Sequence, residues 1–423
     1  MERLLVTGGA RCRGTVRVAG AKNYALKLMA AALLAPGRTV LRNVPRIQDC
    51  MTMGEVLDRL GAGVAWQGER VTIDATDLTS VEAPYELVRR MRASTAVLGS
   101  LLARAGRARV AMPGGDEIGS RPIDLHVQGL QKMGAEVGSE HGFLVARTSG
   151  LRGVPITLDY PSVGATENLM MAAVLARGTT TIDNAAREPE IADIASFLVS
   201  MGARIEGAGT STIEIDGVDT LVAADHTTIP DRIEAGTWAA AAVATRGDVT
   251  LENARPDHLD LFLHKLGDAG ADIAMTERGL RILQTDRARA IDFVTLPYPG
   301  VATDFQPILM AMLATAEGTS IATENVFESR FLYVDELRRM GADIRTEGHH
   351  AVIRGIERLS AAPVRSLDIR AGAAMAVAAL GADGVTEISE LHHLDRGYEG
   401  FVEKMAALGV EVRRVDEPAF RLP

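Results

Sequence analysis

The segment 112–126 combines backbone freedom with groups that could transfer a proton and bind an anion. Its three glycines, at 114, 115 and 119, would let the backbone approach a ligand closely. The same segment carries Asp116, Arg121 and Asp124. A carboxyl group can donate or accept a proton, and a guanidinium group binds phosphate or carboxylate well. The alternative is a polar surface turn, so the decision depends on residues elsewhere in the chain.

Two regular elements flank this segment. Ala108–Ala111 is expected to form a strand, and Leu125–Met133 carries apolar residues at helical spacing. The glycine-rich stretch between them, residues 112–121, is therefore expected to be a mobile loop that joins a strand to a helix.

A pattern of roughly 70 residues recurs six times along the chain. Each copy holds an apolar stretch, a short β-branched run, a turn and an amphipathic helix, which indicates an α/β unit. Five of the copies end in a glycine where a helix C-cap is expected, at Gly61, Gly134, Gly202, Gly270 and Gly341. Six such units predict two domains of three units each, with the boundary near 222–231, where the pattern lapses.

An arginine lies shortly before the second helix of every unit, at Arg46, Arg121, Arg187, Arg255, Arg330 and Arg396. A cation at a helix N-terminus opposes the helix dipole, so its recurrence requires a reason. Either these side chains pair with nearby acids such as Asp49 or Glu188, or several of them converge on an anion. The sequence leaves both interpretations open.

Composition narrows the classes of function. The net charge of −10 argues against a nucleic-acid groove, which needs a basic face. Two cysteines are too few for a disulfide scaffold, and no apolar run reaches membrane-spanning length. Because the N-terminus also lacks the apolar core of a signal peptide, we expect a cytoplasmic protein without a membrane partner. Oligomeric state stays open.

Ten short motifs distributed over the whole chain resemble those of the enolpyruvyl transferases. They are Gly20–Asn23, Met91–Ser94, Pro113–Pro122, Pro161–Thr166, Asn184–Glu190, Asp231–Glu234, Thr303–Asp304, Thr323–Glu328, Asp368–Arg370 and His393–Tyr398. The runs Ser162–Gly164 and Arg121–Leu125 are similar to the branch of the family that acts on nucleotide sugars.

The resemblance implies an α/β fold of two inside-out barrels, each built from three βαβαββ repeats around an interdomain cleft. The first barrel would comprise residues 22–229. Because the chain would cross twice between the barrels, residues 1–21 would join 230–423 in the second. This arrangement agrees with the repeat count.

The implied reaction transfers the enolpyruvyl group of phosphoenolpyruvate to the 3-hydroxyl of UDP-N-acetylglucosamine and releases phosphate, with no metal or redox cofactor. Asp116 would be the general acid and Asp304 the base, with Lys22 and Arg396 also catalytic. The residues implied to bind phosphoenolpyruvate are Lys22, Asn23, Arg121, Arg330, Arg370 and Arg396. Those implied to bind the nucleotide sugar are Arg92, Arg121, Pro122, Ile123, Asp124, Leu125, Ser162, Val163, Gly164, Asp304 and Val326.

Each implied role has a structural alternative. Lys22 could simply begin a helix, and Asp304 could be an N-cap for a helix from Phe305. Asp368 could form an ion pair with Arg370 or orient it. We interpret Asp231, Arg232 and Glu234 as structural residues at the interdomain crossing. The pairs His349–His350 and His392–His393 are interpreted as surface residues, because adjacent side chains face different ways.

Three departures or alternatives bear on function. Most members of the family carry cysteine at the position of Asp116, and fosfomycin alkylates that cysteine, so we expect an active enzyme that resists the drug. Tyr160 stands where some members place a lysine that contacts phosphate. Two other functions remain open, namely enolpyruvyl transfer to another nucleotide in secondary metabolism and nucleotide-sugar binding without turnover.

Overall fold

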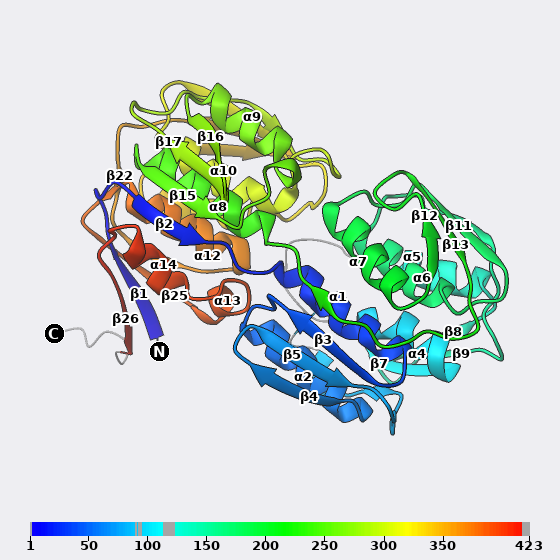
Figure 1. Cartoon of the computed structure of the whole chain (residues 1–423). Coiled ribbons are helices and arrows are strands. Elements are labelled where there is room, and N and C mark those ends of the chain that lie inside the picture. Colours follow the sequence, from blue (N-terminus) through cyan, green and yellow to red (C-terminus); the bar gives the residue numbers. More distant parts are fainter. Residues whose placement is uncertain (1, 89–90, 92–94, 113–122, 417–423) are drawn as a thin grey trace. The chain divides into compact units, whose positions relative to one another are not determined.

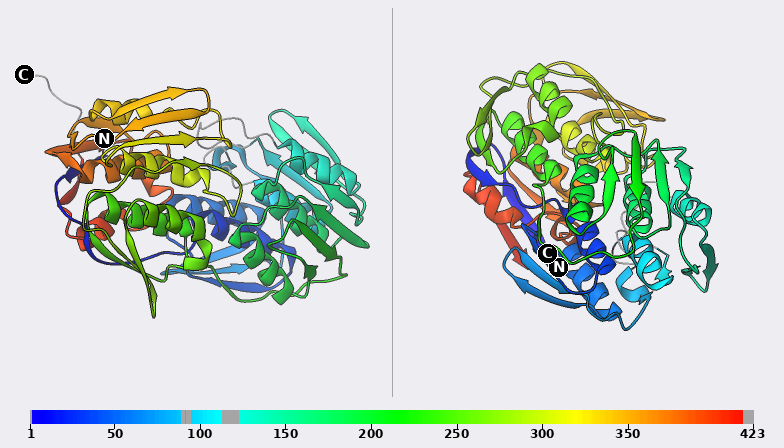
Figure 2. Two further views of the ribbon diagram at one scale, coloured as in Figure 1. Left: turned by 90° about the horizontal axis from the view of Figure 1, so that it is seen from above. Right: turned by 45° about the vertical axis from the view of Figure 1, so that its right-hand side comes forward.

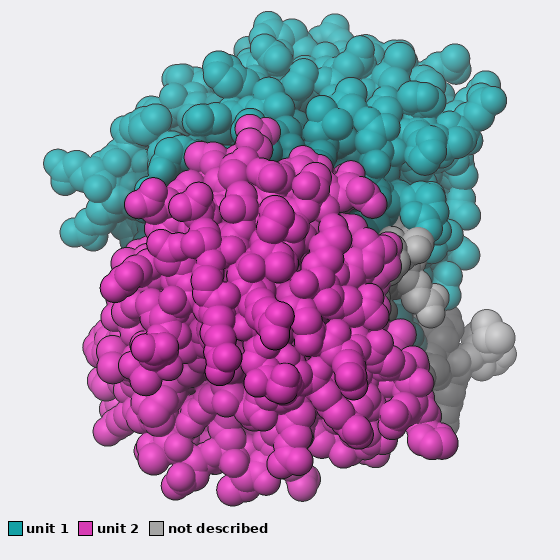
Figure 3. Space-filling model, turned by 90° about the vertical axis from the view of Figure 1, so that its right-hand side faces the viewer, with its two compact units in different colours: residues 1–19, 116–120, 230–423 teal, residues 20–115, 121–229 magenta. Residues whose placement is uncertain are grey.

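The computed structural model describes residues 2–88, 91, 95–112 and 123–416 of the 423-residue chain. The chain divides into two compact units, shown in different colours in Figure 3. Unit 1 comprises residues 1–19 and 230–423, and unit 2 comprises residues 20–115 and 121–229. The sequence analysis placed the divisions at 21/22 and 229/230.

Unit 1 contains three four-stranded sheets, with strand orders β16-β17-β15-β2, β18-β19-β21-β20 and β23-β25-β1-β26. A further two-stranded sheet joins β22 to β24. The strands are β1 (Glu2–Thr7), β2 (Arg13–Arg17), β15 (Asp248–Glu252), β16 (Asp272–Thr276), β17 (Gly279–Leu283), β18 (Phe293–Val294), β19 (Thr319–Thr323), β20 (Asp343–Glu347), β21 (His350–Arg354), β22 (Leu359–Ser360), β23 (Pro363–Arg365), β24 (Ala382–Asp383), β25 (Val385–Ser389) and β26 (Val412–Asp416).

Three helices form the interior of unit 1, and the sheets lie around them (Figures 1 and 2). They are α8 (Arg232–Ala244), α10 (Gln306–Leu313) and α12 (Ile369–Leu380), and every residue of α10 and α12 is buried. Helices α8 and α12 are alanine-rich, and α10 is apolar after its first residue, which is typical of helices without a solvent-facing side. The remaining helices are η3 (Pro256–His258), α9 (Asp260–Asp268), η4 (Thr303–Phe305), α11 (Val334–Arg339), α13 (His392–Asp395) and α14 (Phe401–Ala407).

Unit 2 repeats this plan, with sheet orders β14-β3-β5-β4, β6-β7-β9-β8 and β10-β11-β13-β12. Its strands are β3 (Arg38–Arg42), β4 (Gly63–Gln67), β5 (Arg70–Asp74), β6 (Glu82–Ala83), β7 (Arg107–Ala111), β8 (Glu136–Glu140), β9 (Phe143–Arg147), β10 (Pro155–Thr157), β11 (Thr179–Asp183), β12 (Arg204–Glu206), β13 (Thr212–Asp216) and β14 (His226–Thr227). Its helices are α1 (Lys22–Ala31), η1 (Ala32–Leu34), α2 (Gln48–Leu60), α3 (Tyr85–Val88), α4 (Val97–Ala105), α5 (Asp124–Lys132), α6 (Val163–Ala173) and α7 (Pro189–Ser200). Helices α1, α4 and α6 lie in its interior, and most residues of each are buried.

Every sheet of four strands has one parallel pair followed by antiparallel pairs. In the sheet that contains β15, for example, β2 runs parallel to β15, whereas β17 runs antiparallel to both β15 and β16. The recurrence confirms the α/β fold of repeated units that the sequence predicts. The predicted strand before residue 112 and helix after residue 124 are β7 and α5.

The glycines expected at helix ends all have positive φ. Gly61 is the C-cap of α2 with φ of 99°, and Gly202 follows α7 with φ of 105°. Gly134, Gly270 and Gly341 also lie in this left-handed region, where a β-carbon would be strained. The sequence prediction of a glycine at each of these five helix ends is therefore confirmed.

The two segments that pass between the units pair with each other inside each unit. The Asp231 N–H donates to the carbonyl of Ala19 at 2.8 Å in unit 1. The Ala21 N–H donates to the carbonyl of Ile229 at 2.8 Å in unit 2. Separately, none of the helices in the described part of the chain is both long enough and apolar enough to cross a membrane.

Candidate active site

Asp304, Arg330 and Arg370 form a compact charged cluster in unit 1. Asp304 lies in η4 just before α10, and Arg370 is the second residue of α12. Nε of Arg370 donates to Oδ2 of Asp304 at 3.0 Å, and Nη2 of Arg370 lies 3.0 Å from the same oxygen. Nη2 of Arg330 lies 3.4 Å from Oδ1 of Asp304. Because α10 and α12 pack against each other, their N-termini bring these side chains together.

A glycine allows η4 to lie close to α8. A β-carbon at Gly236 would lie only 2.3 Å from a ring carbon of Phe305, the residue after Asp304. The Phe305 ring also stacks on Phe262, with ring centroids 4.1 Å apart. These contacts fix the backbone that presents the Asp304 carboxylate.

The opposite charges in this cluster shift the pKa values of Asp304 and Arg370. Burial alone would raise the pKa of Asp304, but the charges of Arg370 and Arg330 outweigh it and hold this pKa at about 2. Although Arg370 is buried, the negative charge of Asp304 raises its pKa. Asp304 is therefore ionised over the physiological range.

Two guanidinium nitrogens in this cluster lack an acceptor. Nε of Arg330 and Nη1 of Arg370 are buried and have no hydrogen-bond partner within the described part of the chain. The two arginine residues are only 2% and 5% exposed. A buried donor without an acceptor costs about 1–3 kcal/mol, so an anion that accepted these hydrogen bonds would be favoured here.

Surrounding residues hold Arg370 in place. Asp368 is the N-cap of α12, and its carboxylate accepts hydrogen bonds from the N–H groups of Arg370 and Ala371 at 2.7 and 3.0 Å. The Arg370 guanidinium lies 5.5 Å from the ring centroid of Tyr398, whose hydroxyl is 2.9 Å from that of Thr237. Asp368 thus orients Arg370 through the backbone, and the guanidinium pairs with Asp304 instead of Asp368.

A buried carboxylate, Glu324, organises the loop after β19. Its Oε1 accepts hydrogen bonds from the N–H groups of Val326 and Phe327 at 2.8 and 3.1 Å and from the Thr295 hydroxyl at 2.8 Å. Its Oε2 accepts from the hydroxyl of Thr303 at 2.9 Å. Glu324 therefore connects the backbone at Val326 to the residue before Asp304.

We expect Glu324→Ala to lower the free energy of unfolding by about 3 kcal/mol, because it leaves several buried donors without an acceptor. Glu324→Gln keeps one carbonyl oxygen and should cost about 1 kcal/mol. Urea denaturation followed by circular dichroism measures both. Glu347→Ala, on the exposed part of β20, is the matched control and should change stability by less than about 0.5 kcal/mol. Equal stabilities of Glu324→Ala and the control would contradict this role.

In unit 2, Lys22 begins α1 and is buried. Its Nζ lies 2.8 Å from Oδ2 of Asp49, in the first turn of α2, and both side chains are less than 10% exposed. Lys22 therefore does more than begin a helix, because its ammonium group contributes to a buried ion pair between α1 and α2. Asn23, the next residue, is exposed.

The structure brings together two predicted substrate segments of unit 2. Ser162 is the N-cap of α6 and accepts a hydrogen bond from the Ala165 N–H at 3.3 Å. The His126 ring of α5 bonds Asn168 of α6 at 2.9 Å, and a β-carbon at Gly164 would lie 3.4 Å from that ring. The first turn of α5, with Asp124 and Leu125, consequently lies beside the N-terminus of α6.

The remaining predicted site residues either lie outside the described residues or differ in burial. Arg92, Asp116, Arg121 and Pro122 lie outside the described residues, as does most of the predicted loop 112–121. Arg396 is the C-cap of α13 and is half-buried, as is Val326. Of the recurrent arginines in the described part of unit 1, Arg330 is buried in the charged cluster and Arg255 pairs with Asp257 at 2.8 Å.

The residues interpreted as structural have structural contacts. Asp231 is the N-cap of α8, and the carboxylate of Glu234 accepts from the Ala19 N–H and from Trp238 and pairs with Lys404. Asp304, by contrast, is not an N-cap, because Ala302 precedes η4 and Phe305 precedes α10. Groups of histidine, cysteine and carboxylate residues that could hold a metal ion are not found among the described residues.

Sequence reasoning missed Glu324, Thr237 and the orienting contact of Tyr398. Glu324 and Tyr398 lie within quoted motifs, but only the folded chain shows which atoms they meet. For Glu324 the available signal was a carboxylate directly after a short strand, two and three residues before N–H groups that it could accept from.

Comparison with known proteins gives consistent results. The sequence matches the profile of the EPSP synthase (3-phosphoshikimate 1-carboxyvinyltransferase) family over residues 6–405. It is 54% identical to UDP-N-acetylglucosamine 1-carboxyvinyltransferase of Corynebacterium jeikeium over 98% of this chain and 99% of that protein. It is 55% identical to the protein of the same name in Nocardia farcinica, again over 98% and 99% of the two chains.

Solved structures agree in fold. The enolpyruvyl transferase NikO from Streptomyces tendae superposes with a TM-score of 0.88 at 28% identity, over 99% of both chains. EPSP synthase from Acinetobacter baumannii superposes with a TM-score of 0.78 at 19% identity, over 98% of this chain and all of the other.

Proposed function

The chain belongs to the EPSP synthase family of enolpyruvyl transferases, and we propose that it uses UDP-N-acetylglucosamine as its acceptor. The reaction moves the enolpyruvyl group of phosphoenolpyruvate to the 3-hydroxyl of the sugar and releases phosphate. It is the first committed step of peptidoglycan precursor synthesis. Relatives that are 52–55% identical over nearly their full length carry the corresponding name, which supports this acceptor.

The cluster of Asp304, Arg330 and Arg370 carries the mechanistic proposal. The carboxylate of phosphoenolpyruvate accepts hydrogen bonds from Arg330 and Arg370, including the buried donors that lack an acceptor. Asp304, whose carboxylate contacts both arginines, faces the sugar hydroxyl and removes its proton. The anion and the base therefore share one pair of guanidinium groups.

The electron flow follows from these positions. As Asp304 removes the proton, the hydroxyl oxygen attacks carbon 2 of phosphoenolpyruvate, and Asp116 protonates carbon 3. The tetrahedral intermediate then loses a proton from carbon 3 and expels phosphate, which restores the double bond. Lys22, Arg121 and Arg396 hold the phosphate group and offset its negative charge, and Asn23 binds phosphoenolpyruvate beside them.

Binding of phosphoenolpyruvate to the two arginines also changes the pKa of Asp304, the proposed base. In the unliganded protein the pKa of Asp304 is about 2, which makes the carboxylate a weak base. A bound carboxylate competes for Arg330 and Arg370 and adds negative charge nearby, and both effects raise this pKa. Asp304 thus becomes a stronger base when phosphoenolpyruvate is present.

The nucleotide sugar is assigned to the segments that meet at α5 and α6 together with residues near Asp304. We assign its binding to Arg92, the run 121–125, the run Ser162–Gly164, Asp304 and Val326. The N-terminus of α6 offers N–H groups and a positive dipole end, which suit an anionic diphosphate.

A second candidate is enolpyruvyl transfer to another nucleotide. The structural similarity to NikO, an enolpyruvyl transferase of lower sequence identity, supports this candidate. A protein that binds nucleotide sugar without turnover is disfavoured, because Lys22, Asp304, Arg330 and Arg370 are all retained.

A phosphate-release assay tests the acceptor directly. With phosphoenolpyruvate and UDP-N-acetylglucosamine the protein should release stoichiometric phosphate, whereas UMP and shikimate 3-phosphate should give none above background. Mass spectrometry should find the enolpyruvyl ether on the sugar. Turnover with UMP alone would favour the second candidate, and binding of UDP-N-acetylglucosamine without phosphate release would favour a non-catalytic role.

A further inference from the structure

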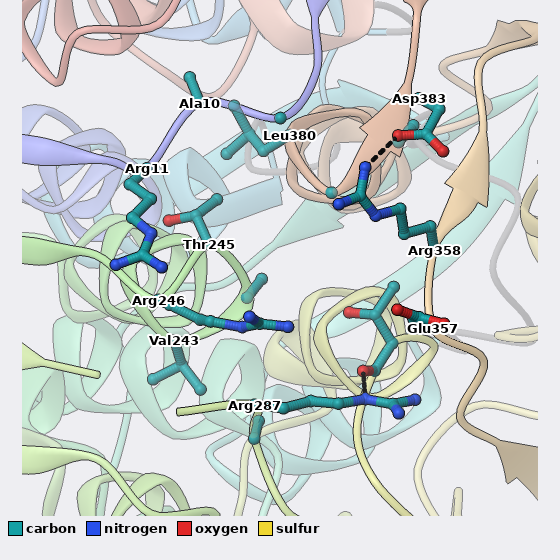
Figure 4. Close-up of a pocket in the computed structure, with 16 residues that line it drawn as sticks. Ala10, Arg11, Val243, Thr245, Arg246, Arg287, Glu357, Arg358, Leu380 and Asp383 are labelled. Carbon is teal, nitrogen blue, oxygen red and sulfur yellow. Dashed lines mark hydrogen bonds and ion pairs between the residues drawn. The ribbon is translucent and has the colours of Figure 1, made fainter. Parts of the chain in front are cut away.

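Unit 1 contains a cavity of about 220 Å³ at the opposite end of its central helices from Asp304. The C-terminal residues of α8 and α12 and the residue Thr315 just after α10 line it (Figure 4). Asp304 and Arg370 lie at the N-terminal ends of α10 and α12. A helix of twelve residues is about 18 Å long, so the cavity is separate from the candidate active site.

Four arginines from four different segments surround this cavity: Arg11, Arg246, Arg287 and Arg358 (Figure 4). Only two carboxylates, those of Glu357 and Asp383, share the lining. The side chains therefore leave an excess of positive charge, although the chain as a whole carries a net charge of −10.

Two of the arginines have structural partners. Arg287 donates to the carbonyl oxygens of Thr315, Ala316 and Ile356 at 2.7–3.0 Å, which satisfies the C-terminal end of α10. Arg358 pairs with Asp383 at 2.8 Å. These contacts account for both guanidinium groups without any ligand.

The side chains of Arg11 and Arg246 have no such partner. Neither forms a hydrogen bond or ion pair with any residue in the described part of the chain, and both are exposed. Arg11 lies between β1 and β2, whereas Arg246 follows α8 with a positive φ of 53°. The dipole of α8 favours a cation at its C-terminal end, where Arg246 lies, but this effect supplies no hydrogen-bond acceptor for the Arg246 side chain. Arg11 belongs to no helix, so no helix end accounts for it.

We propose that this cavity is a second ligand site, which binds a small phosphate-bearing anion between Arg11 and Arg246. Guanidinium groups bind phosphate oxygens through two parallel hydrogen bonds, and two of them can hold one or two phosphoryl groups. The volume is below the usual range for drug-sized ligands and fits a compact anion. The proposal is independent of the reaction assigned to the other end of the helices.

Inorganic pyrophosphate is a suitable probe. We expect equilibrium dialysis at constant ionic strength to detect a bound pyrophosphate that the double variant Arg11→Ala/Arg246→Ala binds at least about tenfold more weakly. The matched control Arg204→Ala/Arg345→Ala changes the charge equally at two exposed positions elsewhere and should bind as the wild type does. Both variants should keep wild-type turnover and unfolding temperature.

Chemical modification locates the site independently of the variants. Pyrophosphate should slow the reaction of phenylglyoxal with Arg11 and Arg246 in the wild-type protein, measured on their peptides by mass spectrometry, and leave Arg204 and Arg345 unprotected. Sulfate at the same ionic strength should protect much less. Pyrophosphate binding that is unchanged in the Arg11→Ala/Arg246→Ala variant, or equal protection of all four arginines, would overturn the proposal. A loss of unfolding temperature in that variant without ligand would show instead that both arginines are structural.

Discussion

The Asp304→Asn variant is expected to lose about a thousandfold in turnover. Asparagine keeps the shape of the side chain but cannot remove the proton of the sugar hydroxyl. The variant should nevertheless bind phosphoenolpyruvate at least as tightly as the wild type, because the two arginines no longer divide their hydrogen bonds between Asp304 and the ligand. Phosphate release and isothermal titration calorimetry give the two quantities.

The same substitution should destabilise the unliganded protein. Arg330 and Arg370 would become two buried cations without a counter-charge, which typically costs about 3 kcal/mol or more. Phosphoenolpyruvate supplies a carboxylate in place of Asp304 and should therefore raise the unfolding temperature of the variant more than that of the wild type. This difference would separate loss of the base from loss of the fold.

Because of Asp304, the free energy of unfolding should decrease as the pH is lowered. Folding lowers the pKa of Asp304 from 3.8 to about 2, so its contribution is fully present well above pH 3.8 and is lost as the pH falls towards 2. The Asp304→Asn variant lacks this contribution at every pH. Its free energy of unfolding should therefore fall less than that of the wild type as the pH is lowered. Urea titrations between pH 5 and about 3 provide the comparison.

Asp248→Asn is the matched control for these measurements. Asp248 also accepts two hydrogen bonds from one guanidinium group, that of Arg281, but the pair lies on the surface of β15 and β17. Turnover and the response to phosphoenolpyruvate should stay close to wild type. If Asp304→Asn kept more than a tenth of wild-type turnover, Asp304 would not be the base.

The sequence predicted the repeated architecture because its determinants are local. Alanine-rich helices, β-branched strands and glycines at helix ends are visible in single stretches, and Gly61 and Gly202 show the conformation expected from them. Asp304 and Arg370 were identified through motifs, yet their mutual contact spans 66 residues and depends on the packing of α10 against α12. No local pattern carries that information.

The pairing of charges was harder to predict for the same reason. The ion pair between Asp49 and Lys22, which lie 27 residues apart on two different helices, was not predicted. Asp368 was considered either as an ion-pair partner of Arg370 or as the residue that orients it, and the structure shows the second, through a helix cap. In both cases the sequence shows that opposite charges are present, whereas helix packing decides which atoms meet.

The two native cysteines bear on how the protein should respond to fosfomycin. Cys12 and Cys50 are fully buried, and burial raises the pKa of Cys12 to about 11. Thiolate is the reactive form of cysteine, so neither residue should react with an epoxide in the folded protein. The resemblance to the enolpyruvyl transferases implies that fosfomycin alkylates a cysteine at the position of Asp116, and a carboxylate is a much weaker nucleophile towards an epoxide.

We therefore expect the wild-type enzyme to keep full activity after prolonged incubation with fosfomycin, whereas Asp116→Cys should be active and lose its activity with time. Asp116→Ala lacks the proposed general acid, and its turnover should fall by about a hundredfold or more. Because both native thiols are buried, mass spectrometry of inactivated Asp116→Cys should find one adduct, on the introduced residue. Ser139→Cys, which places an exposed thiol on β8 outside the proposed site, controls for non-specific alkylation. A fosfomycin adduct on Asp116 itself, or time-dependent inactivation of the wild type, would show that the carboxylate is alkylated after all.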